Sequence, residues 1–267
     1  MTPRTPPTKR RGAVRVVLQG GLGNQLFQFF LGLLEAHHQC FRELRLFATL
    51  LGRYSSPRTL EIANLIDIGP GSLPVHVCPI DPLSSLRIPK VASKFIAADV
   101  RLRIPGFGTL LDGYYQEPRY FMEFDAALVA DTLSQWRARL KHQGLLVERD
   151  MDAVVHLRLR DFFGTQEATT HFVRDSLSSL GHKADIVTDD EDIVADVLRH
   201  AGSPASLQLA PTREMTAWDV LRILTHYSRI RTNGSSLAFW AAVLGRIEFE
   251  SSNSAHVELW RYLLRQP

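Results

Sequence analysis

Residues 14–38 constrain the fold of this chain more than any other segment. Residues 14–18 are apolar and β-branched, apart from Arg15, and predict a buried strand. The glycine-rich turn GGLGNQ follows at residues 20–25, and residues 26–38 form an apolar segment of helix length. A strand, a glycine turn and a helix in this order indicate the opening of an α/β unit.

A second α/β pattern begins near Met151 and predicts strands at 153–157, 184–187, 228–232 and 246–249, with helices at 191–200, 215–227, 237–244 and 257–264. Residues 41–110 are broken by prolines and predict irregular connections. Residues 110–116 predict a strand that leads into a loop, and a continuous or broken helix from 120 to about 143, with Trp136 buried, completes the first half. We therefore expect an α/β fold of two Rossmann-like domains that face a cleft.

The expected domains are a disordered basic tail at residues 1–12, an N-terminal Rossmann-like domain at 13–147 and a C-terminal one at 148–267. The tail is rich in proline and basic residues and has the pattern of neither a signal peptide nor a membrane span. A solvated tail is the preferred interpretation, and peripheral contact with anionic lipid of the inner membrane is the alternative.

The composition is that of an ordinary globular chain, with 267 residues, 45% hydrophobic and 22% charged. A formal net charge of +3 is only weak evidence for an anionic ligand. Cys40 and Cys78 are too few for a disulfide framework, and no Cys/His cluster in the sequence suggests a zinc site. We expect a cytoplasmic protein.

The glycine turn is the first candidate binding element. Gly20, Gly21 and Gly23 permit backbone conformations that a side chain would forbid, and a loop at a helix start presents N–H groups to a phosphate. Asn24 and Gln25 would add side-chain donors. The spacing fits neither the dinucleotide nor the Walker pattern, and a purely structural turn is the alternative.

The second candidate is the end of the strand at 153–157. Strand alternation places His156, Arg158 and Arg160 on one face, with Leu157 and Leu159 on the other. Polar side chains at the carboxyl end of a strand lie where open α/β sheets bind ligands, and arginine matches phosphate bidentately. The alternative is a solvent-facing row of ion pairs.

Two further turns carry polar residues after strands. Residues 233–236 (NGSS) stand before an apolar helix, where Asn233, Ser235 and Ser236 offer both helix capping and donors to an anion. Asp189 and Asp190 follow another strand and are compatible with magnesium, with a sugar hydroxyl or with helix capping; we favour capping.

Taken in order, these pieces resemble glycosyltransferase family 11, the α-1,2-fucosyltransferases. Residues 20–28 match its opening GGLGNQxFQ throughout, and residues 111–121 resemble its G-Y-x-Q…Y-F segment. Residues 156–162 resemble H-x-R-R-G-D-Y, 187–190 resemble S-D-D, and 233–244 resemble N-S-S-F-S-W-W-A-A-W-L. The chain departs from the family where Leu159 and Arg160 replace the second arginine and the glycine.

The resemblance implies a GT-B fold and an inverting, metal-independent transfer of fucose from GDP-fucose to a galactoside hydroxyl of an oligosaccharide or lipid-linked glycan. No cofactor and no nucleic-acid partner are expected. The C-terminal half would bind the donor and the N-terminal half the acceptor. The alternatives are another GDP-fucose transferase, of protein or α-1,6 type, and a catalytically impaired nucleotide-sugar-binding protein.

The resemblance also implies roles for individual residues. Arg158 would hold the β-phosphate, helped by Asn24, while His156 and Asp219 would bind the guanosine. Asp161 is the candidate base for the acceptor hydroxyl. The remaining expected donor-binding residues are Gly21, Gly23, Gln25, Asn233, Ser235 and Ser236.

Overall fold

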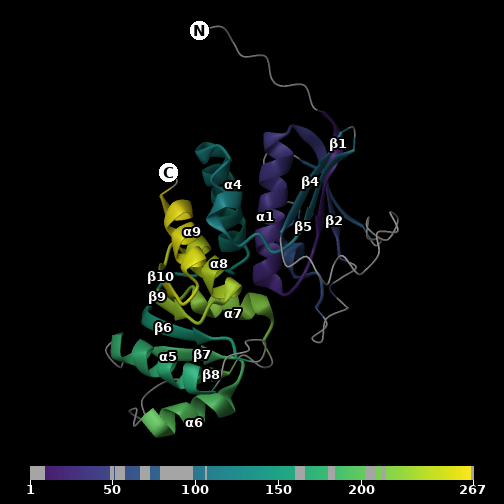
Figure 1. The fold of residues 1–267 in the computed structure, drawn as a ribbon. Helices are drawn as coiled ribbons and strands as arrows, with labels where there is room; N and C mark the ends of the chain where they lie inside the picture. The colour runs from purple at the N-terminus through teal and green to yellow at the C-terminus, as the bar shows by residue number, and fades with distance from the viewer. Residues whose placement is uncertain are drawn as a thin grey trace. The chain divides into compact units, whose positions relative to one another are not determined.

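The computed structural model describes residues 10–48, 51, 58–66, 73–78, 99–105, 107–159, 166–179, 184–201, 209–211 and 215–265 (Figure 1). The chain divides into two compact units, of which the N-terminal unit ends at Trp136 and the C-terminal unit begins at Arg137. This division falls inside helix α4 (Ala126–His142), before the boundary at 147/148 that the sequence suggests. Of the expected tail at 1–12, residues 1–9 lie outside the described residues.

The N-terminal unit contains a five-stranded sheet in the order β3-β2-β1-β5-β4. Its strands are β1 (Arg10–Val17), β2 (Phe41–Phe47), β3 (Val75–Cys78), β4 (Val100–Ile104) and β5 (Gly108–Asp112). Neighbouring strands are parallel, except that β4 is antiparallel to β5. β1 begins at Arg10, so residues 10–12 of the expected tail belong to a strand.

Helix α1 (Leu22–His38) lies on one face of this sheet, where Gly32 lets its backbone approach β1 and β2. The other side of α1 contacts α4 through aromatic rings: Trp136 stacks on Phe29 with ring centres 5.6 Å apart and meets Phe30 edge-to-face at 5.2 Å. Trp136 is fully buried, as the sequence predicts. Two 3-10 turns, η2 (Glu61–Leu65) and η3 (Pro118–Tyr120), complete the described helical parts of this unit.

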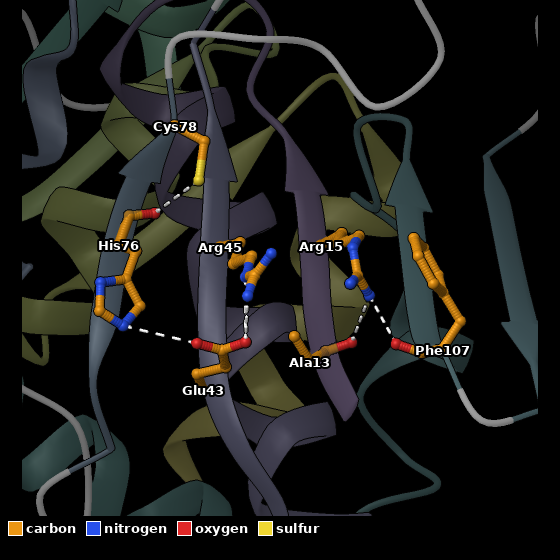
Figure 2. Close-up of polar contacts among 7 residues, drawn as sticks. All are labelled: Ala13, Arg15, Glu43, Arg45, His76, Cys78 and Phe107. Carbon is orange, nitrogen blue, oxygen red and sulfur yellow. Dashed lines mark hydrogen bonds and ion pairs between the residues drawn. The ribbon is translucent and has the colours of Figure 1, made fainter. Parts of the chain in front are cut away.

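The sheet face opposite α1 carries a group of polar and charged side chains (Figure 2). Arg15 of β1 stacks on Phe107, with its guanidinium carbon 3.5 Å from the ring centre, and donates to the Phe107 carbonyl oxygen at 2.6 Å. On β2, Arg45 pairs with Glu43 at 2.6 Å, and His76 of β3 lies 3.5 Å from the same carboxylate. Burial, and then the charge of Arg45, lower the pKa of Arg15.

The C-terminal unit contains a fully parallel sheet in the order β10-β9-β6-β7-β8. Its elements, in chain order, are β6 (Met151–Leu157), α5 (Gln166–Ser179), β7 (Asp185–Thr188), α6 (Glu191–Ala201), β8 (Leu209–Pro211), α7 (Ala217–Leu224), β9 (Tyr227–Thr232), α8 (Ser236–Gly245), β10 (Glu248–Ser251) and α9 (Ser254–Leu264). Strands are added outward from β6 to β8, and the chain then returns to the other side of β6 as β9. The strand order therefore reverses between β6 and β9, and the N-terminal sheet has the corresponding point between β1 and β5.

These two sheets confirm the predicted α/β fold with two Rossmann-like domains. The sequence did not indicate β2, β3, β4, β8 or α5. Helix α8 is apolar and buried on all sides, and it anchors the core of its unit. Among the described residues, no helix combines the length and the apolar character that crossing a membrane requires. The expected cleft between the domains stays a prediction.

The close approach of α1 to the sheet makes Gly32 testable. A Cβ at Gly32 would lie 2.7 Å from Val16 Cγ2 and 3.1 Å from a Leu44 methyl carbon. Alanine favours a helix by about 1 kcal/mol over glycine, but overpacking a core costs about 1–3 kcal/mol. We expect Gly32→Ala to lower the free energy of unfolding, measured with urea. In the double variant with Val16→Ala the loss should be smaller than the sum, and a more stable Gly32→Ala would contradict this packing.

Candidate functional site

The first candidate site lies at the carboxyl edge of the C-terminal sheet, where the strand order reverses. His156 of β6 is in register with Thr232 of β9, and each strand ends within one residue of this pair. Arg158 and Asn233 follow directly after these strands. Open α/β sheets bind ligands at such reversal points, so the structure brings two of the predicted site segments together.

The side-chain amide of Asn233 fixes the backbone of Arg158. The Arg158 N–H donates to Asn233 Oδ1 at 3.1 Å, and Asn233 Nδ2 donates to the Arg158 carbonyl oxygen at 3.0 Å. Asn233 is buried, so both bonds are shielded from water. These two hydrogen bonds continue the β6–β9 pairing beyond the ends of the strands. The sequence motif alone did not indicate them.

Asp189 and Asp190 divide two structural tasks. Asp190 caps α6, because its Oδ1 accepts from the Ile193 N–H at 3.3 Å. Asp189 accepts from the backbone N–H of Leu159 at 2.7 Å and so ties the end of β7 to the end of β6. The capping interpretation is confirmed for Asp190, and Asp189 stabilises the segment that carries Arg158.

His156 is buried on the sheet face shared with Arg158. Leu159 packs with Val155 and Leu157 against the apolar cluster on the other face, as the predicted alternation requires. Burial first, and then the nearby charge of Arg158, lower the pKa of His156 to about 3. Its Nδ1 has no hydrogen-bond partner within the described part of the chain. The imidazole is therefore neutral at physiological pH.

The start of α8 lies beside this pair. Ser235 is its N-cap residue and accepts from the Ala238 N–H at 3.4 Å, while its own N–H donates to Thr232 Oγ1 at 3.3 Å. Ser236 is the first helical residue, and both serines are buried. A helix N-terminus carries a partial positive charge, so it favours an anion at this edge.

Of the two acidic residues predicted for the site, the structure describes Asp219 but not Asp161. Asp219 is exposed and forms a capping box at the start of α7, where its Oδ2 accepts from the Thr216 N–H at 3.1 Å and from Thr216 Oγ1 at 2.6 Å. These two hydrogen bonds lower the pKa of Asp219. Helix α7 connects β8 to β9, so its N-terminus lies at the same sheet edge as Arg158. Asp161, like Arg160, lies outside the described residues.

The second candidate site is the glycine loop after β1. Gly20 has a φ of +71°, which favours glycine, and Gly21 is the N-cap of α1 without a side-chain cap. Asn24 Oδ1 accepts from Gln116 Nε2 at 2.8 Å, which joins the loop to the segment after β5. The predicted α/β opening is thus tied to the point where the N-terminal strand order reverses.

Gln25 is a buried residue whose amide bonds only to backbone in the described structure. Its Nε2 donates to the carbonyl oxygens of Gly20 at 3.0 Å and Thr59 at 2.9 Å, and its Oε1 accepts from the Glu61 N–H at 2.9 Å. This geometry makes Gln25 a scaffold for the loop, where the sequence suggested a donor to the ligand. Gly23 is a buried residue in the first turn of α1.

The arrangement at the C-terminal edge suits a phosphorylated ligand. Arg158 supplies a cation, α8 supplies a positive helix end, and His156 offers a neutral ring that can donate one hydrogen bond and accept another. Among the described residues, no group of three or more His, Cys, Asp or Glu side chains is arranged to hold a metal ion.

Comparison with known proteins gives only distant likenesses. No protein-family model and no curated protein matches the chain. The chain is similar to the crystal structure of the fucosyltransferase NodZ from Bradyrhizobium, at 12% identity and a TM-score of 0.48, covering 88% of this chain and 93% of that chain. It is also similar to NodZ α-1,6-fucosyltransferase soaked with GDP-fucose, at 13% identity and a TM-score of 0.49, covering 88% and 92%. Values this low assign neither family nor activity, so the resemblance to family 11 stays a prediction.

The Asn233 amide can be tested by exchanging its donor for an acceptor. Asn233→Asp places a carboxylate oxygen against the Arg158 carbonyl, and leaving a buried group unsatisfied costs about 1–3 kcal/mol. We expect a loss of that size in the free energy of unfolding. Asn253→Asp is the matched control, because within the described structure the Asn253 side chain accepts from the Ala255 N–H as the cap of α9 and donates to no other group. Equal stability of the two variants would contradict the two hydrogen bonds between Asn233 and Arg158.

The burial of His156 predicts a pH dependence. Its folded pKa of about 3 lies below the unfolded value of about 6.5, so below pH 6.5 the unfolded state binds a proton that the folded state does not. Its contribution to stability is therefore complete above about pH 6.5 and falls by up to about 1.4 kcal/mol per pH unit between pH 6.5 and 3. NMR titration should show a neutral His156 ring at pH 5, and a midpoint near 6.5 would refute this burial.

Proposed function

We propose that this chain is an inverting α-1,2-fucosyltransferase that moves fucose from GDP-fucose to a galactoside hydroxyl of a glycan. The observation that carries the proposal is that His156, in register with Thr232, and Arg158, whose backbone bonds to Asn233, lie just before the N-terminus of α8, at the reversal point of the C-terminal sheet. These residues belong to the segments that resemble family 11. The chemistry available at this edge is the binding of a nucleoside diphosphate.

In the proposed reaction, Arg158 neutralises the charge that develops on the β-phosphate as GDP leaves. The N-terminus of α8, with Ser235 and Ser236, adds fixed dipoles to the same task. Because Asn233 holds the backbone of Arg158, the point from which the guanidinium side chain extends is fixed. Donors that are already oriented lose no free energy to reorganisation during transfer.

The guanosine would be recognised by His156 and Asp219. Nδ1 of the neutral His156 ring has no hydrogen-bond partner among the described residues, so a ligand group could supply one. The Asp219 carboxylate accepts hydrogen bonds, and guanine presents two neighbouring N–H donors where adenine does not. Asp219 would have to keep its Thr216 bonds on one oxygen and use the other for the base.

The acceptor is proposed to bind mainly the N-terminal unit, whose glycine loop is proposed to contact the donor through Gly21, Gly23 and Asn24. Asp161 is the proposed base for the acceptor hydroxyl. The transfer is proposed to need no metal ion, because arginine and helix donors provide the charge stabilisation. Activity should accordingly survive chelation by EDTA.

An impaired nucleotide-sugar-binding protein is the second candidate, because Leu159 stands where the family has arginine. Leu159 packs into an apolar cluster, so this position contributes no charge to the ligand. Binding of GDP-fucose without release of GDP would favour this candidate. Transfer to a protein or in an α-1,6 linkage would instead appear as a different product from the same donor.

Arg158→Ala tests the proposed donor site. A charge-assisted hydrogen bond contributes about 1.5–3 kcal/mol, and more when it strengthens in the transition state. We expect turnover to fall at least about a hundredfold, with an unchanged urea midpoint.

Calorimetry with GDP, UDP and ADP should show tight binding of GDP alone to the unmodified protein.

The matched control for Arg158→Ala is Arg199→Ala, at an exposed arginine of α6, which should keep full turnover. Near-normal turnover of Arg158→Ala would remove this residue from the site.

A further inference from the structure

Tyr114 is an exposed aromatic residue at the carboxyl edge of the N-terminal sheet. It comes two residues after Asp112, the end of β5, which is in register with Val17, the end of β1. The strand order reverses between these two strands, and open α/β sheets bind ligands at such a point. The side chain is 40% exposed, and within the described part of the chain it makes no hydrogen bond, ion pair or ring contact.

A single exposed aromatic residue is common on protein surfaces, but the backbone that carries this one is held on both sides. The Tyr114 N–H donates to Asp99 Oδ1 at 2.6 Å, and the Gly113 carbonyl oxygen accepts from Gln28 Nε2 of α1 at 2.9 Å. Two residues further on, Gln116 bonds to the glycine loop at 2.8 Å. Three side-chain hydrogen bonds therefore fix the segment from which the Tyr114 ring extends.

Tyr115 gives two consecutive tyrosines opposite environments. Its φ is +53°, a left-handed conformation that bulky residues rarely adopt. Its ring is fully buried, and its hydroxyl donates to the Val100 carbonyl oxygen. A strained backbone persists only where the surrounding structure holds it, and such strain is concentrated at ligand sites. Here the strained residue is buried and the residue before it is exposed.

The chemistry around Tyr114 favours a neutral ligand. Glu117 and Arg119 pair with each other at 2.8 Å, and Asp99 accepts from the Tyr114 N–H. The free group is an aromatic ring whose face is negative and whose edge carries one hydroxyl. One face of a galactose ring presents a patch of weakly positive C–H groups, which can pack on such a ring while the sugar hydroxyls stay in water.

We propose that the ring of Tyr114 is a stacking platform for the galactose ring of the acceptor. The identity of this sugar rests on the proposed function, in which the acceptor binds mainly the N-terminal unit. Tyr114 then determines affinity for the acceptor without contacting GDP. The aromatic ring is the required group, and the phenolic hydroxyl is dispensable.

Two variants separate the ring from the hydroxyl. Tyr114→Leu removes the ring and keeps an apolar side chain, whereas Tyr114→Phe keeps the ring. The matched control is Phe107→Leu, because Phe107 is 42% exposed and directly precedes β5, at the opposite end of that strand. Urea midpoints of all variants are compared, and those of both Tyr114 variants should equal that of the unmodified protein.

We expect the KM for lactose to rise about three- to tenfold in Tyr114→Leu and less than about twofold in Tyr114→Phe. The kcat and the affinity for GDP-fucose should stay unchanged in both, and Phe107→Leu should keep the KM of the unmodified protein. An unchanged KM in Tyr114→Leu, or an equal rise in both Tyr114 variants, would overturn the platform. A loss of GDP affinity would show that the ring meets the base, and would overturn it too.

Direct binding of lactose provides a test that does not depend on turnover. Saturation-transfer NMR, with and without GDP, should show transfer to the galactose C–H protons, and Tyr114→Leu should weaken it while Phe107→Leu should not. Lactose that binds the unmodified protein under neither condition, or binds Tyr114→Leu equally well, would overturn the platform. Lactose binding without any GDP binding would instead refute the proposed donor and leave the platform standing.

Discussion

The rest of the C-terminal site depends on the two hydrogen bonds between the Asn233 amide and the backbone of Arg158. Parallel strands lose their ladder partners where they end, and the polar groups beyond must pair with something else. Asn233 replaces that ladder at the end of β9, and Asp189 does so from the end of β7 through the Leu159 N–H. Three neighbouring strand ends are thereby tied together, which gives Arg158 a fixed position without using its own side chain.

The N-terminal unit uses amide side chains in the same way. Gln28 Nε2 donates to the Gly113 carbonyl oxygen at 2.9 Å, Gln116 bonds to Asn24, and Gln25 ties the loop to the segment at 59–61. Two of the three polar side chains in residues 24–28 therefore hold backbone, and the third is held by Gln116. A motif that suggests ligand donors from its composition therefore also serves as a scaffold for the loop.

The parts of the fold that sequence reasoning predicted are those whose side chains agree with a single environment. β6 and α8 are apolar runs with polar ends, and each was predicted within a few residues, as was β9, in which Arg229 and Arg231 alternate with the buried Ile230 and Thr232. β2 was missed because Arg42, Glu43 and Arg45 interrupt it, although these charges lie at a sheet surface and its Leu44 and Leu46 are buried. The capping role of Asp190 is local and readable, whereas the bonds of Asp189, Asn233 and Gln25 join distant segments and leave no local pattern.

The replacement of arginine by Leu159 changes the site less than the motif suggests. Leu159 lies on the sheet face away from His156 and Arg158 and packs with Val155 and Leu157. An arginine placed there would have to reach past this apolar cluster or bury its charge, which is costly without a partner. The only polar contact that the structure assigns to residue 159 is its backbone N–H with Asp189, which any residue except proline can make. The backbone geometry that holds Arg158 is therefore independent of the side chain at 159, and among the described residues that directly follow β6 it is Arg158 that carries a cationic side chain.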